Sequence, residues 1–183
     1  AIKLSEHKRA LSALSRTDSL TGLLNHGSWK DLLHLKFHKC RQQQSHATIA
    51  LIDIDHFKQI NDTHGHIVGD AVLRQLSLEI RRNLRENDLA GRYGGDEFCV
   101  ILPQMPLEQA AKIMEQMRET FGNYRPPQIP ELRVSLSIGL ADFQPRFTDA
   151  AMWLNAADRA LYAAKDTGRN RVNVSDDRIA CSA

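Results

Sequence analysis

Two adjacent glycines, Gly94–Gly95, constrain the fold of this chain more than any other feature, because they separate two stretches that read as strands. Residues 89–93 before them and 98–102 after them predict an antiparallel hairpin whose tight turn uses glycine at positive φ. The acidic pair Asp96–Glu97 follows the turn directly, although both residue types are unfavourable in strands. Such a local conflict is typical of a functional site, whereas an ordinary acidic hairpin is the competing interpretation.

The rest of the chain alternates predicted helices with predicted strands. Apolar spacing and capping residues predict helices over about 28–43, 67–85, 107–121 and 150–166, the first of them capped by Ser28. Apolar or alternating runs predict further strands over 48–54, 132–140 and 171–174. The fold class that follows is α/β in the α+β sense, a mixed sheet with helices packed around it.

The composition limits the classes of protein that this chain can represent. A length of 183 residues with 42% hydrophobic and 25% charged residues suits one globular domain with a sizeable core. A net charge of +2 gives no reason to expect nucleic acid as a partner. The three cysteines form neither a disulfide framework nor a metal-ligand spacing, and no apolar run is long enough to cross a bilayer. We therefore expect a cytoplasmic setting, as a separate protein or as the cytoplasmic domain of a larger, membrane-tethered protein with an upstream sensor domain.

The first 15 residues read as a separate helical segment. Leu4, His7, Leu11 and Leu14 are spaced alternately by three and four residues, which is typical of a short coiled coil. Two interpretations stay open, a signalling or linker helix that dimerises and an ordinary helix that packs on its own domain. The main domain is expected over 16–175, followed by a short tail over 176–183.

A second acidic cluster lies at the end of the strand predicted over 48–54. We expect Asp55 to leave the strand and to cap a helix that begins at His56. Asp53 has no such role, and a carboxylate at the end of an apolar strand is costly unless it meets a cation or hydrogen-bond donors. The position of Asp53 therefore predicts that a cation or hydrogen-bond donors lie next to its carboxylate.

Asp53, Asp96 and Glu97 would converge if the acidic hairpin lay beside this strand. Oxygen ligands without an accompanying cysteine favour Mg²⁺ or Mn²⁺. Because Mg²⁺ is usually held by one or two carboxylates together with substrate phosphates, the cluster indicates a site for nucleoside triphosphates.

Three separated motifs together resemble the GGDEF domain: residues 94–98 (GGDEF), residues 53–62 (DIDHFKQIND) and residues 18–25 (DSLTGLLN). The resemblance covers about 16–174, nearly the whole chain. It implies diguanylate cyclase activity, in which two GTP molecules are condensed into cyclic di-GMP and two pyrophosphates across a homodimer. It also implies a largely antiparallel, palm-like sheet as in nucleotide cyclases.

The resemblance further implies the catalytic machinery. Two catalytic cations, Mg²⁺ or Mn²⁺, would bind in each active half-site to Asp53, the main-chain carbonyl of Ile54 and Asp96. Glu97 would be a general base or an additional metal ligand. Paired metals can activate a ribose 3′-hydroxyl and neutralise the departing pyrophosphate, so an amide at position 96 or 97 is expected to abolish turnover and preserve the fold.

Substrate recognition is implied in the same way. The resemblance assigns guanine to Asn61 and Asp70 and the triphosphate to Lys165 and Arg169, with Phe57, Lys58, Gly94 and Gly95 near the same pocket. A carboxylate at Asp70 can accept from guanine N1–H and the exocyclic amine, so GTP should be preferred over ATP. Without the resemblance, Asn61 and Asp70 would be interpreted as helix caps, and the basic pair as partners of a helix C-terminus.

A product-inhibition site is implied by Arg85 and Asp88, which have the spacing of the family's inhibitory motif for cyclic di-GMP. Arg85 could bind a guanine O6/N7 edge while Asp88 accepts from its Watson–Crick edge. The sequence departs from the family at His26, where relatives commonly carry arginine, and at Gln116, where a second arginine often completes product binding. Arg118 lies close to that position, and weaker inhibition is expected.

Three functions remain as alternatives at this point. The first and favoured one is an active cyclase. A noncatalytic receptor for GTP or cyclic di-GMP would more naturally have lost the acidic pair, and a palm-type transferase acting on nucleic acid would need a basic groove that the charge does not indicate.

Overall fold

The computed structural model of the chain describes residues 15–176, so the predicted N-terminal helix up to residue 14 and the tail from residue 177 lie outside the described residues. The strands are β1 (Ala47–Ile54), β2 (Leu89–Arg92), β3 (Glu97–Pro103), β4 (Leu136–Asp142) and β5 (Arg171–Val174). The helices are α2 (His26–Gln43), α3 (Phe57–His64), α4 (His66–Asn83), α5 (Leu107–Gly122) and α6 (Ala150–Asp166).

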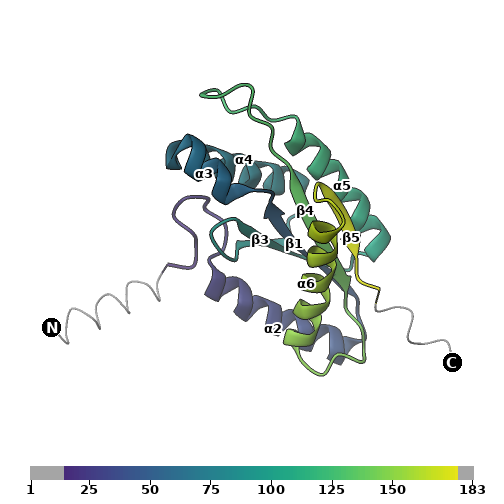
Figure 1. Ribbon diagram of the computed structural model, residues 1–183. Coiled ribbons are helices and arrows are strands. Elements are labelled where there is room, and N and C mark those ends of the chain that lie inside the picture. Colours follow the sequence, from purple (N-terminus) through teal and green to yellow (C-terminus); the bar gives the residue numbers. More distant parts are fainter. Residues whose placement is uncertain (1–14, 177–183) are drawn as a thin grey trace.

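The strands form one sheet in the order β2-β3-β1-β4-β5 (Figure 1). Strand β1 lies at the centre and pairs antiparallel with both β3 and β4, and β2 pairs antiparallel with β3. Only the pair of β4 and β5 is parallel among the described strands. The predicted fold class, a mixed and largely antiparallel sheet surrounded by helices, is confirmed.

Helices cover both faces of the sheet (Figure 1). Alternate residues of β1 point to opposite faces, as the pleat requires. Ala50 and Ile52 belong to the apolar cluster shared with α3, α4 and α5. Ile49 and Leu51 belong to the second cluster, shared with α2 and α6. The centre of the sheet is therefore buried on both sides, which explains why β1 reads as a continuous apolar run.

Two local predictions need correction. Helix α2 begins at His26 and is capped by Asn25, whose side chain accepts a hydrogen bond from the Ser28 N–H; Ser28 itself is not the cap. Strand β4 begins at Leu136, because the chain from 126 to 132 forms two turns instead of a strand. Across residues 15–176 the structure has no helix with the length and apolar character needed to span a bilayer.

Helix α6 packs unusually close to β4 at Gly139. A Cβ atom added to Gly139 would lie 2.7 Å from the Leu161 Cα and closer still to the Leu161 N and the Ala157 O. These are main-chain atoms of α6, so no side chain can move to make room. The glycine thus fixes the separation between the sheet and the helix that carries Lys165.

We predict that Gly139→Ala lowers the free energy of unfolding by about 3 kcal/mol or more, because the helix must shift away from the sheet. Urea denaturation measures this loss. Gly27→Ala is the matched control, since Gly27 lies in the first turn of α2 and the nearest neighbour of an added Cβ is 3.9 Å away. Equal stability of the two variants would contradict the close packing as the cause.

Candidate active site

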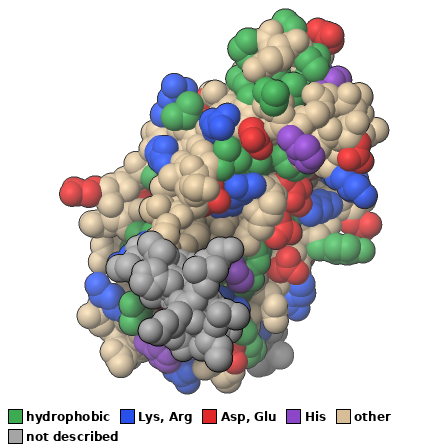
Figure 2. All heavy atoms as spheres, turned by 90° about the vertical axis from the view of Figure 1, so that its left-hand side faces the viewer, with side chains coloured by type: hydrophobic (Ala, Val, Ile, Leu, Met, Phe, Trp, Pro, Cys, Tyr) green, Lys and Arg blue, Asp and Glu red, His purple; other side chains and the backbone are tan. Residues whose placement is uncertain are grey.

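The acidic residues of two distant segments meet at one end of the central strands. Asp53 lies directly opposite Glu97 in the register of β1 and β3, so their side chains share one face of the sheet. The Ile54 N–H donates to the Asp96 carbonyl at 3.4 Å, which places Asp96 beside the end of β1. The structure therefore brings Asp53, Ile54, Asp96 and Glu97 together. Figure 2 shows acidic and basic side chains close together across the middle of the face it presents.

Asp53 is buried, with 5% of its surface exposed, and its carboxylate is only partly satisfied. Its Oδ2 forms an ion pair with the Lys165 Nζ, whereas its Oδ1 is buried without a hydrogen-bond partner. Burial raises the pKa of the Asp53 carboxyl to about 7; the hydrogen bond from Lys165 opposes this rise, and the neighbouring Asp96 adds to it. Asp53 therefore lies where more positive charge would be stabilising.

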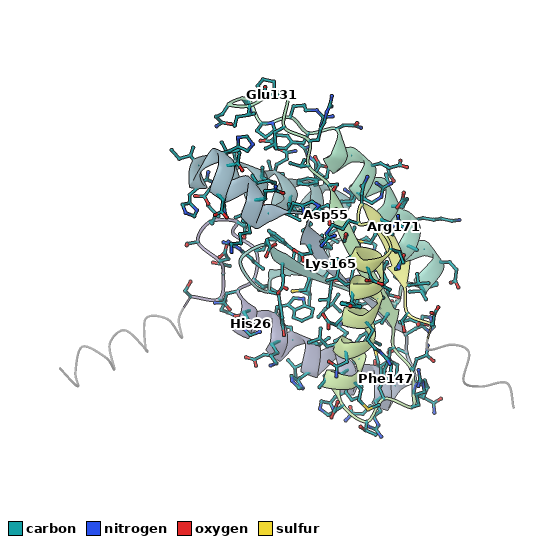
Figure 3. The ribbon with its side chains drawn as sticks, in the orientation of Figure 1. His26, Asp55, Glu131, Phe147, Lys165 and Arg171 are labelled. Atoms are coloured by element: carbon teal, nitrogen blue, oxygen red, sulfur yellow. The ribbon has the colours of Figure 1, made fainter. Side chains whose placement is uncertain are left out.

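Lys165 belongs to the last turn of α6 and points toward the end of β1, where Asp55 also lies (Figure 3). Burial lowers the pKa of the Lys165 ammonium, but the hydrogen bond to Asp53 and the charges of Asp53, Glu97 and Asp96 raise it overall. The lysine accordingly stays charged and supplies the positive charge that Asp53 has in this structure.

The hairpin turn differs from its prediction. Neither Gly94 nor Gly95 has a positive φ, so a left-handed backbone does not explain why glycine occurs at these two positions. A Cβ on Gly94 would lie 2.9 Å from the Glu97 Oε2, whereas a Cβ on Gly95 would meet nothing within 4 Å. The first glycine makes room for the Glu97 carboxylate, and the second leaves open space beside the acidic residues.

An anchor that the sequence did not predict holds this turn. The Arg92 Nη2 and Nε donate to the Gly95 carbonyl at 2.7 and 3.1 Å, and the Arg92 Nη1 donates to the Asp18 carboxylate at 3.2 Å. Asp18 in turn accepts from the N–H and the hydroxyl of Thr21. The one signal for this anchor in the sequence is that Asp18 opens one of the three motifs; nothing in the sequence pairs it with Arg92, which lies 74 residues further along the chain.

Asp55 does not cap α3 as predicted. The residue before α3 is His56, in the left-handed conformation with φ 56°, and no side-chain hydrogen bond caps the helix. The buried Asp55 carboxylate instead accepts from the hydroxyls of Ser135 and Ser137, both at 2.6 Å, and from the Asn170 N–H at 3.0 Å. Three donors, two from the start of β4 and one from the loop after α6, thus replace the expected capping role.

The residues expected to recognise a base lie around the junction of α3 and α4. Gly65 alone separates the two helices, with φ 85°. The Asn61 Oδ1 is buried without a hydrogen-bond partner. A Cβ on Gly69 would collide with the Asn61 amide, its Cγ at 2.9 Å, so this glycine is required by the position of Asn61. Asp70 follows it, half-buried in α4.

The other residues predicted to contact the substrate lie in α3 and in the loop after α6. Phe57 is buried, and its ring would lie 3.3 Å from a Cβ on Gly69. Lys58 is exposed on α3, and Arg169 is exposed in the loop after α6 with φ 62°. Both cations are therefore available to anionic groups of a ligand.

The donor set fits divalent cations held jointly with a ligand. Within residues 15–176 there is no group of three or more His, Cys, Asp or Glu residues arranged to hold a metal unaided. The unpartnered Asp53 Oδ1, with Asp96 beside it, offers hard oxygen ligands of the kind that Mg²⁺ shares with phosphates. Asp53, the Ile54 carbonyl, Asp96 and Glu97 are the residues that would hold the ions.

The predicted inhibition residues lie at the opposite end of β3. The Arg85 Nη2 donates to the Asp88 Oδ1 and to the Pro103 carbonyl, both at 2.7 Å. Pro103 and Glu97 are the two ends of β3, which places Arg85 roughly 20 Å from the acidic cluster. The Asp88 side chain is fully buried while that of Arg85 is 48% exposed, so Asp88 orients the arginine and only Arg85 faces solvent.

Comparison with known proteins agrees with this geometry. The family model described as "Diguanylate cyclase, GGDEF domain" matches residues 15–171. The chain is 43% identical over 175 residues to the probable diguanylate cyclase DgcC of Escherichia coli, covering 96% of this chain and 47% of that protein. It is 36% identical over 161 residues to the diguanylate cyclase DgcP of Pseudomonas aeruginosa, covering 87% of this chain and 24% of DgcP. The chain thus spans half or less of the length of these relatives.

A solved structure shares the fold over nearly its whole length. The GGDEF domain of DgcB from Caulobacter crescentus, in complex with c-di-GMP, superposes with a TM-score of 0.84 at 33% identity. The match covers 88% of this chain and 96% of that chain.

The raised pKa of Asp53 predicts a pH dependence of stability in the absence of divalent ions. The pKa is about 7 in the folded chain against 3.8 for an unperturbed aspartate, so the contribution of Asp53 is complete at low pH and is lost as the pH rises through about 7. Relative to Asp53→Asn, the wild type should lose roughly 2 to 4 kcal/mol of unfolding free energy between pH 4 and pH 8. Urea denaturation of both proteins across this range measures it. A difference that stays constant with pH would contradict the raised pKa.

Proposed function

Since the chain belongs to the GGDEF family of diguanylate cyclases, we propose that it condenses two GTP molecules into cyclic di-GMP and two pyrophosphates. The observation that carries the proposal is the buried Asp53 carboxylate, which has one unpartnered oxygen and lies beside Asp96 and Glu97. A site whose carboxylates need positive charge and whose border carries exposed cations suits a cation-bound triphosphate.

Each residue contributes a separate function in this proposal. Asp53 and Asp96, with the Ile54 carbonyl, hold two Mg²⁺ or Mn²⁺ ions in each half-site. When bound, these ions acidify the attacking 3′-hydroxyl and neutralise charge on the departing pyrophosphate. Glu97 accepts the proton or completes the ligand set. Arg92 keeps the 94–96 turn in place through its hydrogen bonds to the Gly94 and Gly95 carbonyls.

Base and phosphate recognition come from the neighbouring helices. The unpartnered Asn61 Oδ1 can accept from guanine, and the Asp70 carboxylate can accept from its N1–H and exocyclic amine. Lys165 and Arg169 neutralise the triphosphate, with Lys58 at the border. Adenine lacks the matching donors, so we propose GTP as the substrate.

Catalysis in this proposal needs a homodimer, because each half-site holds one GTP and each 3′-hydroxyl attacks the other nucleotide. We assign the dimerising or signalling role to the segment 1–15 and the catalytic role to 16–175, with 176–183 as a tail. An upstream sensor domain and a cytoplasmic setting complete the proposal. The setting agrees with the free, buried thiols of Cys40 and Cys99.

We also propose product inhibition through Arg85. The arginine lines a groove of about 610 Å³ together with Lys36, Lys39 and Glu86, and the excess of cationic over anionic side chains around the groove suits the phosphates of a dinucleotide. Asp88 would orient the guanidinium instead of reading the base, since its side chain is buried. Arg118, the candidate for a second arginine, is held by Glu115 and Asn170, which agrees with weak inhibition.

Replacing Asp96 or Glu97 with its amide should lower cyclic di-GMP formation at least about 100-fold, because ligation of the catalytic ions and their charge stabilisation are lost. The fold should persist, since the change is isosteric. Incubation with GTP and Mg²⁺ followed by chromatography measures the product, and circular dichroism checks the fold. Glu131→Gln, in an exposed loop far from the site (Figure 3), is the control. Undiminished turnover by both amide variants would refute the proposed function.

Replacing Arg85 with alanine should relieve inhibition by cyclic di-GMP, raising the inhibitory concentration about tenfold or more because a charge-assisted contact is lost. Initial rates of pyrophosphate release at increasing cyclic di-GMP measure it. Arg82→Ala is the matched control, because Arg82 is 65% exposed and bonds to Glu79 outside the groove. Equal inhibition of Arg85→Ala and the wild type would remove Arg85 from the inhibitory site.

A further inference from the structure

The Asp55 carboxylate joins three separate segments of the fold. Oδ2 accepts from the Ser135 hydroxyl and from the Asn170 N–H, and Oδ1 accepts from the Ser137 hydroxyl. The Asp55 N–H also donates to the Ser135 carbonyl at 3.0 Å. Asp55 thereby connects the end of β1 to the start of β4 and to the loop between α6 and β5.

The loop that receives this contact has an unusual backbone. Gly168, Arg169 and Asn170 have φ values of 123°, 62° and 47°, three consecutive residues with positive φ. Two of them are not glycine, and such residues keep this conformation only where their surroundings hold it. The hydrogen bond from the Asn170 N–H to Asp55 supplies one restraint, and a bond from the Arg118 Nη1 to the Asn170 Oδ1 at 2.6 Å supplies a second.

The same loop and the adjoining helix end carry the cations of the site. Lys165 lies in the last turn of α6 and Arg169 in the loop, while Asp53 lies two residues before Asp55 on β1. Figure 3 shows Asp55 and Lys165 close together at this junction. A single buried carboxylate therefore connects the strand end that would hold the ions to the segment that would hold the phosphates.

We propose that Asp55 is a positioning residue, which fixes Arg169 and Lys165 relative to Asp53 so that the triphosphate and its cations are bound in one geometry. This inference rests on the proposed function. Asp55 touches neither substrate nor ion in this proposal; it acts through the 167–170 loop. Its loss should weaken nucleotide binding, whereas a merely structural role would lower stability and leave affinity unchanged.

The test compares Asp55→Ala with Asp55→Asn. Asparagine keeps the shape and can offer its oxygen to Ser135 and Asn170, while its amide donates to the Ser137 hydroxyl, which rotates to accept. Alanine removes all three contacts. Glu79→Ala is the matched control, because Glu79 is a buried carboxylate on α4 that accepts hydrogen bonds from Gln75 and Arg82 of the same helix.

The readouts are amide hydrogen exchange of the ion-free full chain and affinity, with Mg²⁺, for a GTP analogue that has a methylene between its α- and β-phosphates. In Asp55→Ala we expect the Asn170 amide to lose protection and the dissociation constant to rise about tenfold or more. In Asp55→Asn and Glu79→Ala we expect affinity within about threefold of the wild type. KM should rise in Asp55→Ala more than kcat falls.

The outcomes separate this inference from the proposed function. If the wild type binds no analogue, the proposed function fails and the inference fails with it. If the wild type binds and Asp55→Ala binds equally well, Asp55 is not a positioning residue and the proposed function stands. Should Asp55→Ala not fold, Ser137→Ala replaces it, with Ser77→Ala in α4 as its matched control. A rise in the dissociation constant of Ser137→Ala but not of Ser77→Ala supports the inference. Equal affinities of these two variants overturn it.

Discussion

The buried carboxylate of Asp53 is the constraint on which the rest of the site depends. It lies at the end of the central strand, with apolar layers on both faces of the sheet, and such a position is unfavourable for an anion unless positive charge is near. The chain meets this need with Lys165 from the last turn of α6, and leaves the Oδ1 without a partner. The close approach of α6 to β4 at Gly139 brings that lysine within reach.

Much of this arrangement could be predicted from the sequence. The apolar run of β1 indicated a buried strand, and the glycine hairpin indicated two adjacent antiparallel strands. Convergence of Asp53 with the acidic pair further needed the pairing of β1 with β3, which the sequence left as a condition and the structure shows. The helices α5 and α6 ended within one residue of their predicted ends, because apolar spacing and breaking residues coincide there.

Other features depended on contacts between residues far apart in the chain. Asp55 precedes a helix, and capping is the usual role of aspartate there. Two serines at the start of β4 and a main-chain amide 115 residues away instead donate hydrogen bonds to the same carboxylate. In the sequence Arg92 cannot be distinguished from other strand residues, because its partner Asp18 comes close only in the folded chain. The glycines of the hairpin suggested positive φ, which neither of them has; in the structure Gly94 leaves room for the Glu97 carboxylate, and an added Cβ on Gly95 would contact nothing within 4 Å. Local sequence cannot show which of several donors will be nearest after folding.

The pairing of Lys165 with Asp53 has a thermodynamic consequence. One ammonium group cannot stay close to the Asp53 carboxylate and also move fully onto a substrate phosphate, so transfer of the lysine requires another positive charge to take its place. If the chain binds a cation and a nucleotide as proposed, occupancy of the two positions would be cooperative, and cooperativity of binding is reciprocal. The factor by which a bound ion would raise the affinity for the nucleotide is then the factor by which the nucleotide would raise the affinity for the ion.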